Sequence, residues 1–139
     1  WAQWGVKSVS GELPADDLPA SLMLPMGQHG PAFLAYQNFR VYLQWNQSLT
    51  YAMTAAHLAD RMAGARMLSK GDGQQIKSLE YEEIKELQRL LTKHGHDVGE
   101  ADGKIGAGTR KAVKAMQILY KLPADSYPTP ELLAALRAH

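Results

Sequence analysis

The chain has 139 residues, of which 45% are hydrophobic and 21% are charged, a length that suits one domain or two small ones. This composition excludes disordered and collagen-like chains. Fifteen basic and fourteen acidic residues leave a net charge of +1, so we expect no nucleic-acid partner. No apolar run approaches the roughly 18 residues of a membrane span, and without cysteine there is no disulfide framework.

The N-terminal part of the chain is predicted to change from loops to helices near residue 38. Four of the seven prolines lie in residues 1–31, a segment that we expect to form loops and one short strand over residues 20–24. Apolar residues at one-face helical spacing predict a first helix within residues 38–46. A second helix is predicted to begin after Ser48, a good N-cap, and to end at Gly64 in the left-handed conformation.

The polar, glycine-bearing stretch 67–77 is predicted to be a linker. Beyond it we expect three helices, with Ser78, Thr109 and Thr129 as their N-caps. A weak internal repeat is also present, because the sequence LeuGlnArgLeuLeu at 87–91 resembles MetGlnIleLeuTyr at 116–120. The pattern indicates a small three-helix bundle, near the lower size limit for a domain that folds without metal or disulfide.

Residues 98–109 resemble the middle of a calcium-binding EF-hand loop, but both ends of the motif are missing. Val98 and Thr109 stand where a hard cation requires the first carboxylate and the final bidentate Glu. We therefore predict an Asx-type turn at Asp102, with Gly103 at positive φ.

Other patterns of catalytic or metal sites are incomplete. His94 and His96 have no third ligand at zinc spacing, and the glycines before Thr109 lack the strand and the Lys-Ser/Thr of a phosphate loop. The carboxylates between residues 80 and 86 are expected on an exposed helix face, where nothing apolar would raise a pKa into the general-acid range. We expect no metal and no cofactor.

Aromatic and amide side chains gather between residues 38 and 51. They are Asn38, Phe39, Tyr42, Trp45, Asn46, Ser48 and Tyr51. A sugar site needs flat apolar faces for the C–H side of a pyranose ring and fixed amides or hydroxyls for its polar groups. The aromatic members also suit a buried core, which composition alone favours, so the residues leave both interpretations open.

Residues 30–53 and 57–64 closely resemble the C-terminal end of the catalytic domain of MltB-type lytic murein transglycosylases. The matching pieces are, in order, a GPAFL-like strand, an NF helix, an aromatic-Asn-x-Ser-x-x-Tyr-Ala turn and a LAD-R helix. Residues 78–139 resemble a peptidoglycan-binding type 1 module, through LeuGln at 87–88, AspGlyLysIleGly at 102–106 and ThrProGluLeuLeu at 129–133.

These resemblances imply a mainly α chain. A partial lysozyme-like transglycosylase segment over residues 1–66 would precede the linker at 67–77 and a three-helix peptidoglycan-binding bundle over 78–139. Carried over by motif position, Asn46 and Tyr51 would line the glycan cleft, and Ser48 would shape the turn that holds them. Asp102 and Gly103 would form a turn of the binding module.

The resemblance also implies a chemistry, cleavage of the MurNAc–GlcNAc β-1,4 bond with formation of a 1,6-anhydro end. In that family a single Glu, within an ESxxG-like helix, acts first as acid and then as base. No Glu of this sequence has that context. We therefore expect the chain to be a C-terminal part of the enzyme that begins inside the catalytic domain and is inactive alone.

The implied partners are peptidoglycan glycan strands and the N-terminal part of the catalytic domain. The implied location is the periplasm or cell envelope, with an upstream outer-membrane anchor as one arrangement. The alternative is a non-catalytic peptidoglycan-binding protein that retains a relic of the enzyme domain. Sequence upstream of Trp1 would separate the two hypotheses, because only the enzyme requires a Glu-bearing helix there.

Overall fold

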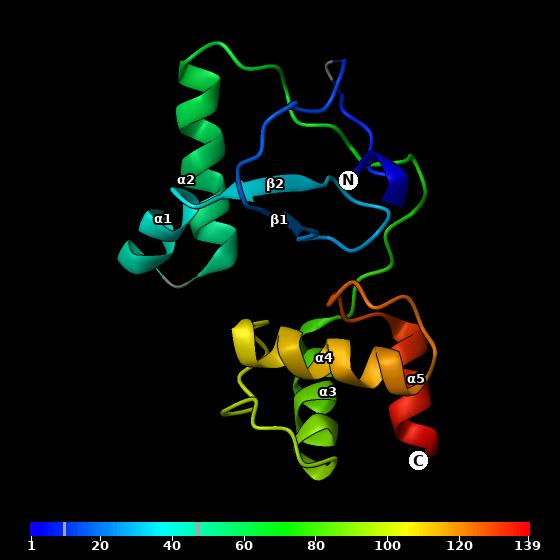
Figure 1. The fold of residues 1–139 in the computed structure, drawn as a ribbon. Coiled ribbons are helices and arrows are strands. Elements are labelled where there is room, and N and C mark those ends of the chain that lie inside the picture. Colours follow the sequence, from blue (N-terminus) through cyan, green and yellow to red (C-terminus); the bar gives the residue numbers. More distant parts are fainter. Residues whose placement is uncertain (10, 47) are drawn as a thin grey trace.

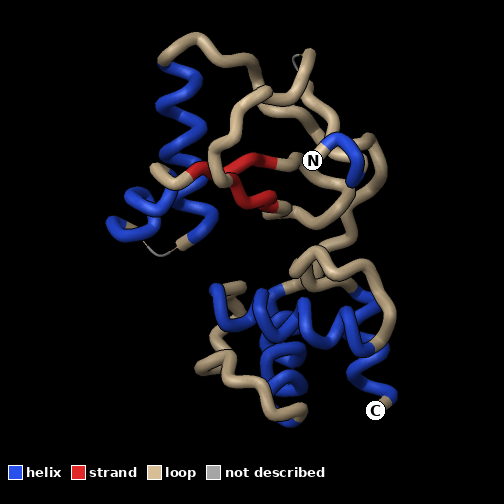
Figure 2. Tube along the Cα trace, viewed as in Figure 1, coloured by secondary structure: helices blue, strands red, loops and turns tan. Residues whose placement is uncertain are grey.

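The structure, a computed structural model, describes residues 1–9, 11–46 and 48–139 and has two parts. The N-terminal part holds a two-stranded sheet and the helices α1 and α2, and the C-terminal part holds α3, α4 and α5 (Figure 1). A segment without helix or strand runs from α2 to α3 (Figure 2). In the described part of the chain, no helix is both long and apolar enough to span a membrane.

The sheet of the N-terminal part follows a short 3-10 helix, Ala2–Trp4, that the sequence analysis does not predict. Strand β1, Ala20–Met23, pairs antiparallel with β2, Phe33–Tyr36, so that Ala20 lies opposite Tyr36. The strand predicted over residues 20–24 is thus confirmed.

Helices α1, Phe39–Trp45, and α2, Leu49–Met62, pack against each other, and α1 also contacts β2. Ser48 is the N-cap of α2, because its side chain accepts a hydrogen bond from the Tyr51 amide at 3.4 Å. Gly64 follows the end of α2 with φ +93°, the left-handed conformation that the sequence predicts.

The C-terminal part is the predicted three-helix bundle. Helix α3, Tyr81–Lys93, packs against both α4, Ala107–Leu119, and α5, Pro130–Ala138. One hydrophobic core joins the three helices, formed by Leu79, Leu87, Leu91, Ala112, Val113, Met116, Leu132, Leu133 and Leu136. The N-terminal part differs, because Ala52 is its one buried hydrophobic residue among those that the structure describes.

Two of the three predicted helix caps in the bundle are wrong. Helix α3 begins after Glu80 instead of Ser78, because the Glu83 carboxylate accepts a hydrogen bond from the Glu80 amide at 2.8 Å and forms a capping box. Helix α4 begins after Gly106, which places Thr109 inside the helix, where it is buried. The third cap is confirmed, since Thr129 accepts a hydrogen bond from the Leu132 amide at 3.3 Å.

Candidate functional site

The three residues predicted to line or shape a glycan cleft lie together where α1 meets α2. Asn46 is the C-cap of α1, and its side-chain oxygen accepts a hydrogen bond from the Ser48 amide at 2.9 Å. Ser48 in turn holds the Tyr51 amide. The side-chain amide of Asn46 is therefore fixed by the backbone of Ser48, which is the preorganisation that recognition of a sugar hydroxyl requires.

An accessible aromatic pair lies beside this corner. The ring centroids of Trp45 and Tyr51 are 5.4 Å apart with the planes tilted by 56°. Trp45 is 69% exposed and Tyr51 is 48% exposed. Composition favours a buried core position for the aromatic residues of this cluster, and for Trp45 that prediction is wrong. An aromatic face next to a fixed amide is the combination that binds the apolar side and the hydroxyls of a pyranose.

The remaining aromatic residues of the predicted cluster line a separate cavity of about 330 Å³ between β2, α1 and α2. Phe39 and Tyr42 lie in its wall, with ring centroids 6.1 Å apart. His57 and Asp60 of α2 also line this cavity, and the sequence analysis did not select them. Their spacing of three residues within the predicted helix is the signal that would have placed them on one face.

One further group of this cavity is a hydroxyl held in its neutral form. The Tyr36 hydroxyl donates a hydrogen bond to an Asp16 carboxylate oxygen at 3.0 Å. Desolvation raises the pKa of Tyr36 above its usual 10.0, and the hydrogen bond to the Asp16 carboxylate raises it further. The hydroxyl keeps its proton at neutral pH, as an ordinary tyrosine does, and this proton is used in the bond to Asp16.

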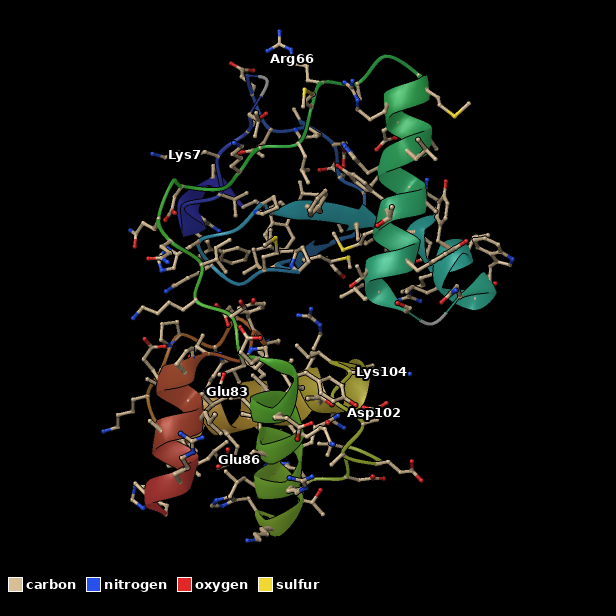
Figure 3. The ribbon with its side chains drawn as sticks, turned by 180° about the vertical axis from the view of Figure 1, so that it is seen from behind. Lys7, Arg66, Glu83, Glu86, Asp102 and Lys104 are labelled. Carbon is tan, nitrogen blue, oxygen red and sulfur yellow. The ribbon has the colours of Figure 1, made fainter. Side chains whose placement is uncertain are left out.

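In the C-terminal part, Asp102 and Gly103 form the predicted Asx turn. Figure 3 labels the side chains of Asp102 and Lys104 at this turn. One Asp102 carboxylate oxygen accepts a hydrogen bond from the Lys104 amide at 2.9 Å, and Gly103 has φ +75°. The buried side chain of Gln88 holds the turn, since its oxygen accepts the Gly103 amide at 2.9 Å and its nitrogen donates to Asp102 at 3.1 Å. The Lys104 amide, followed by Gln88, lowers the pKa of Asp102 below its usual 3.8.

The second half of the weak repeat builds the same turn again. Gln117 accepts the Ser126 amide at 2.9 Å and donates to Asp125 at 2.9 Å. The same Asp125 oxygen accepts the Tyr127 amide at 2.9 Å, and Ser126 has φ +66°. The sequence predicts the repeated Gln and the turn at Asp102, but neither the turn at Asp125 nor the hold of each glutamine on its turn.

Metal-binding residues do not gather in the described ranges 1–9, 11–46 and 48–139. No group of three or more His, Cys, Asp or Glu there could hold one ion. His96, considered above as half of a zinc pair, instead lies with a ring nitrogen 3.3 Å from the Met116 sulfur.

Comparison with known families agrees with this division of the chain. Residues 1–60 match the family described as Transglycosylase SLT domain, and residues 80–136 match the family described as Putative peptidoglycan binding domain. The N-terminal part is therefore similar to the SLT transglycosylase family and the C-terminal part to the peptidoglycan-binding family. No curated protein gives a significant match.

Solved structures of one bacterial protein resemble nearly the whole chain. SltB3 from Pseudomonas aeruginosa, in complex with NAG-anhNAM-pentapeptide, is 44% identical over 99% of this chain, with a TM-score of 0.72. Its complex with NAG-NAM-pentapeptide is 43% identical over the same share, with a TM-score of 0.73. In both cases the match covers 37% of the SltB3 chain. The resemblance to MltB-type transglycosylases is thereby confirmed.

Proposed function

We propose that this chain supplies one wall of the glycan cleft and the cell-wall-binding module of a lytic murein transglycosylase. The 44% identity to SltB3, over 99% of the chain, carries this proposal. SltB3 was solved with one ligand that contains an anhNAM unit and one that contains NAM, and an anhydro end is the product implied for this family. The substrate proposed for the parent enzyme is the peptidoglycan glycan strand.

The corner between α1 and α2 is the proposed contact with the glycan. Asn46 would donate or accept a hydrogen bond with a sugar hydroxyl, and Tyr51 would offer both its ring and its hydroxyl. Ser48 would hold the corner and need not touch the sugar. The fixed amide and the exposed Trp45–Tyr51 pair support these roles.

We infer that residues 1–139 alone are inactive, because the acid that protonates the leaving oxygen lies outside them. The carboxylates of α3 support this: Glu83 caps the helix, and Glu86 forms an ion pair with Arg137 at 2.7 Å. The Arg137 guanidinium holds the pKa of Glu86 below its usual 4.5, the opposite of what a general acid needs. A cell-envelope or periplasmic location is part of the same proposal, since that is where its substrate lies.

The test uses purified sacculi and mass spectrometry of the released fragments. The chain alone should release no anhydro-muropeptides, whereas the chain mixed with a polypeptide corresponding to the rest of the SltB3 catalytic domain should release them. Turnover by the chain alone would contradict the assignment of the acid to another segment. Binding to sacculi without activity in either mixture would favour the alternative, a non-catalytic peptidoglycan-binding protein.

A further inference from the structure

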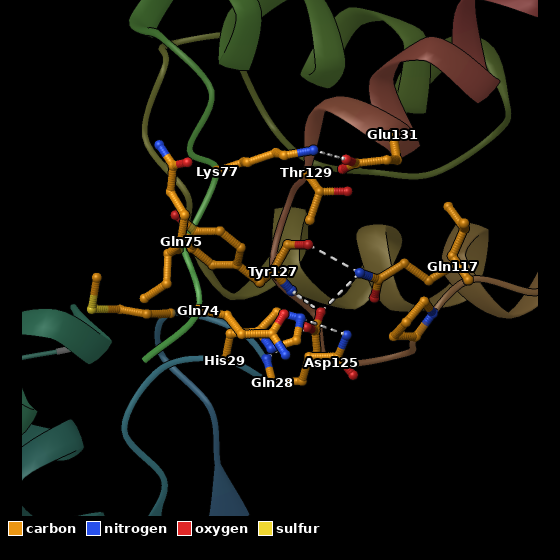
Figure 4. A pocket seen from close by; sticks show the side chains of 15 residues that line it. Gln28, His29, Gln74, Gln75, Lys77, Gln117, Asp125, Tyr127, Thr129 and Glu131 are labelled. Atoms are coloured by element: carbon orange, nitrogen blue, oxygen red, sulfur yellow. Dashed lines mark hydrogen bonds and ion pairs between the residues drawn. The ribbon is translucent and has the colours of Figure 1, made fainter. Parts of the chain in front are cut away.

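A pocket of about 330 Å³ lies at the junction of the two parts, separate from the α1–α2 corner and from the Asp102 turn. Three segments line it: residues 26–29 ahead of β2, residues 74–77 of the predicted linker, and residues between 117 and 131 (Figure 4). Its volume falls within the range of about 300–1,000 Å³ that is usual for small-ligand pockets. A ligand bound there would contact both parts of the chain.

One wall of the pocket is fixed by Asp125. One oxygen of this carboxylate accepts from Gln117, and the other accepts the backbone amide of Gln28 at 2.9 Å. Gly27, with φ +75°, lies so close that a Cβ there would be 2.9 Å from the same Asp125 oxygen. Nearby, Arg110 donates to the Pro25 carbonyl at 3.0 Å. Asp125 of the second turn and Arg110 of α4 therefore hold residues 25–28 by hydrogen bonds.

The linker segment is held over the pocket by a second set of contacts. A ring nitrogen of His29 lies 2.8 Å from an Asp72 carboxylate oxygen, and the Asp72 amide donates to the His29 carbonyl at 3.2 Å. Asp72 also accepts the Gln74 amide at 2.9 Å. Contacts within the chain thus hold all three walls, which lowers the entropy cost of binding.

The polar groups of the pocket suit a peptide that carries both a carboxylate and an ammonium group. The side chains of Gln28, Gln74 and Gln75 each offer a donor and an acceptor, as a peptide backbone requires (Figure 4). At the rim, Lys77 and Glu131 form an ion pair at 2.9 Å, and their side chains are 63% and 52% exposed. Both charges are therefore within reach of a ligand.

A neutral sugar fits this arrangement less well. A sugar hydroxyl gains little from the ion pair of Lys77 and Glu131, because a neutral side-chain amide already offers it a donor and an acceptor. The two charges do match a ligand that carries both a carboxylate and an ammonium group. The accessible aromatic pair that a pyranose would stack on, Trp45 and Tyr51, belongs to the α1–α2 corner instead.

We propose that the junction pocket binds the peptide portion of a peptidoglycan fragment, with the peptide carboxylate at Lys77, an ammonium group at Glu131 and the backbone along the three amides. The proposal rests on the proposed function for the source of the peptide. Because the pocket is built from both parts, the peptide would fix the module relative to the glycan corner while the sugar chain occupies that corner.

The test is a two-dimensional NMR titration of the full 139-residue chain. Three probes are compared: NAG-NAM-pentapeptide, the NAG-NAM disaccharide without peptide, and the free pentapeptide. We expect the two peptide-bearing probes, and not the disaccharide, to shift the amide signals of Gln28, Gln75 and Tyr127. A pentapeptide with an amidated C-terminus should bind more weakly, because it lacks the carboxylate for Lys77.

Matched variants locate the interaction. Lys77→Met should weaken pentapeptide binding by about three- to tenfold, the net scale of one hydrogen bond at an exposed side chain. Lys93→Met, at an exposed lysine in the last turn of α3, should leave it unchanged. The inference is overturned if the peptide shifts no junction signals, or if Lys77→Met and the amidated peptide both bind as the originals do. Disaccharide shifts at the α1–α2 corner without peptide shifts at the junction would overturn this inference alone and leave the proposed function standing.

Discussion

Gln88 and Gln117 occupy equivalent places in the two halves of the bundle, and each closes a turn of the same design. They are 1% and 2% exposed, and each side-chain oxygen accepts the amide of a residue at positive φ. Each nitrogen donates to an aspartate, Asp102 in the first half and Asp125 in the second. The two turns differ in one respect, since only Asp125 uses its second oxygen to hold the N-terminal part of the chain.

Replacing either glutamine should destabilise the bundle. Gln88→Ala or Gln117→Ala removes a buried amide and leaves turn amides without their acceptor, so we expect a loss of about 2–4 kcal/mol in the free energy of unfolding. Urea denaturation followed by circular dichroism measures it. Gln44→Ala, at an exposed position of α1, is the control and should change the value by less than about 0.5 kcal/mol. Losses as small as the control's would show that the turns do not depend on these side chains.

The junction should be sensitive to one added methyl group. Gly27→Ala would place a Cβ 2.9 Å from the Asp125 carboxylate and 3.1 Å from the Tyr127 Cβ, so we expect the contact between the two parts to open. Limited proteolysis should then cleave residues 66–77 faster. Gly95→Ala is a matched control, because Gly95 also has positive φ, +84°, has open space around its Cβ position and lies outside residues 66–77. Equal cleavage rates in the two variants would mean that backbone strain alone, and not the junction, is responsible.

The features that sequence predicted correctly are local. The Asx turn at Asp102 and the cap at Thr129 depend on hydrogen bonds that span two or three residues, and the side chain itself favours them. The wrong cap at Ser78 has the same origin, because Ser is a better N-cap than Glu in isolation. The start of α3 is set instead by the reciprocal hydrogen bonds between Glu80 and Glu83. The N-cap preference of a single residue does not include such a pair.

The junction could not be predicted, because its contacts join distant residues. The bond between the Gln28 amide and Asp125 spans 97 positions, and neither residue type requires it. The candidate glycan corner was more accessible to sequence analysis, since Asn46, Ser48 and Tyr51 are held by bonds between near neighbours. His57 and Asp60 were missed because they share a wall with β2, which lies more than twenty residues earlier in the chain.

The glycan corner can be tested in the reconstituted enzyme. Tyr51→Phe removes a hydroxyl and Asn46→Ala removes an amide, and each should lower kcat/KM by the equivalent of about 1–3 kcal/mol. Asn46→Ala also removes the acceptor for the Ser48 amide, so Asn46→Asp, which keeps that oxygen, separates binding from turn geometry. If all three variants retain full activity, or lose it only through unfolding, the assignment of these residues to the glycan is wrong.

Acid should weaken the bundle partly through Asp102. Hydrogen bonds hold its pKa in the folded chain below the usual 3.8. As the pH falls, Asp102 is therefore protonated first in the unfolded chain. The stabilisation that Asp102 gives above its usual pKa is lost as the pH drops through its lower pKa in the folded chain. Asp102→Asn should reduce the difference in unfolding free energy between neutral pH and about pH 3. Asp17→Asn, at a surface aspartate of the N-terminal part, is the control, and an equal effect in both variants would contradict the role of Asp102.

The two parts of the chain should differ in their ability to fold alone. The hydrophobic core lies between Leu79 and Leu136, so a fragment of residues 75–139 should unfold cooperatively in urea, with helical circular dichroism as the signal. A fragment of residues 1–66 should show no cooperative transition, because Ala52 is the one buried hydrophobic residue described in it.

All three tryptophans lie within residues 1–66, so in the full chain tryptophan fluorescence reports on the N-terminal part and circular dichroism mostly on the bundle. We expect the fluorescence transition at lower urea than the circular dichroism transition. Coincident transitions, together with a 75–139 fragment that does not fold, would show that the junction makes the two parts one cooperative unit.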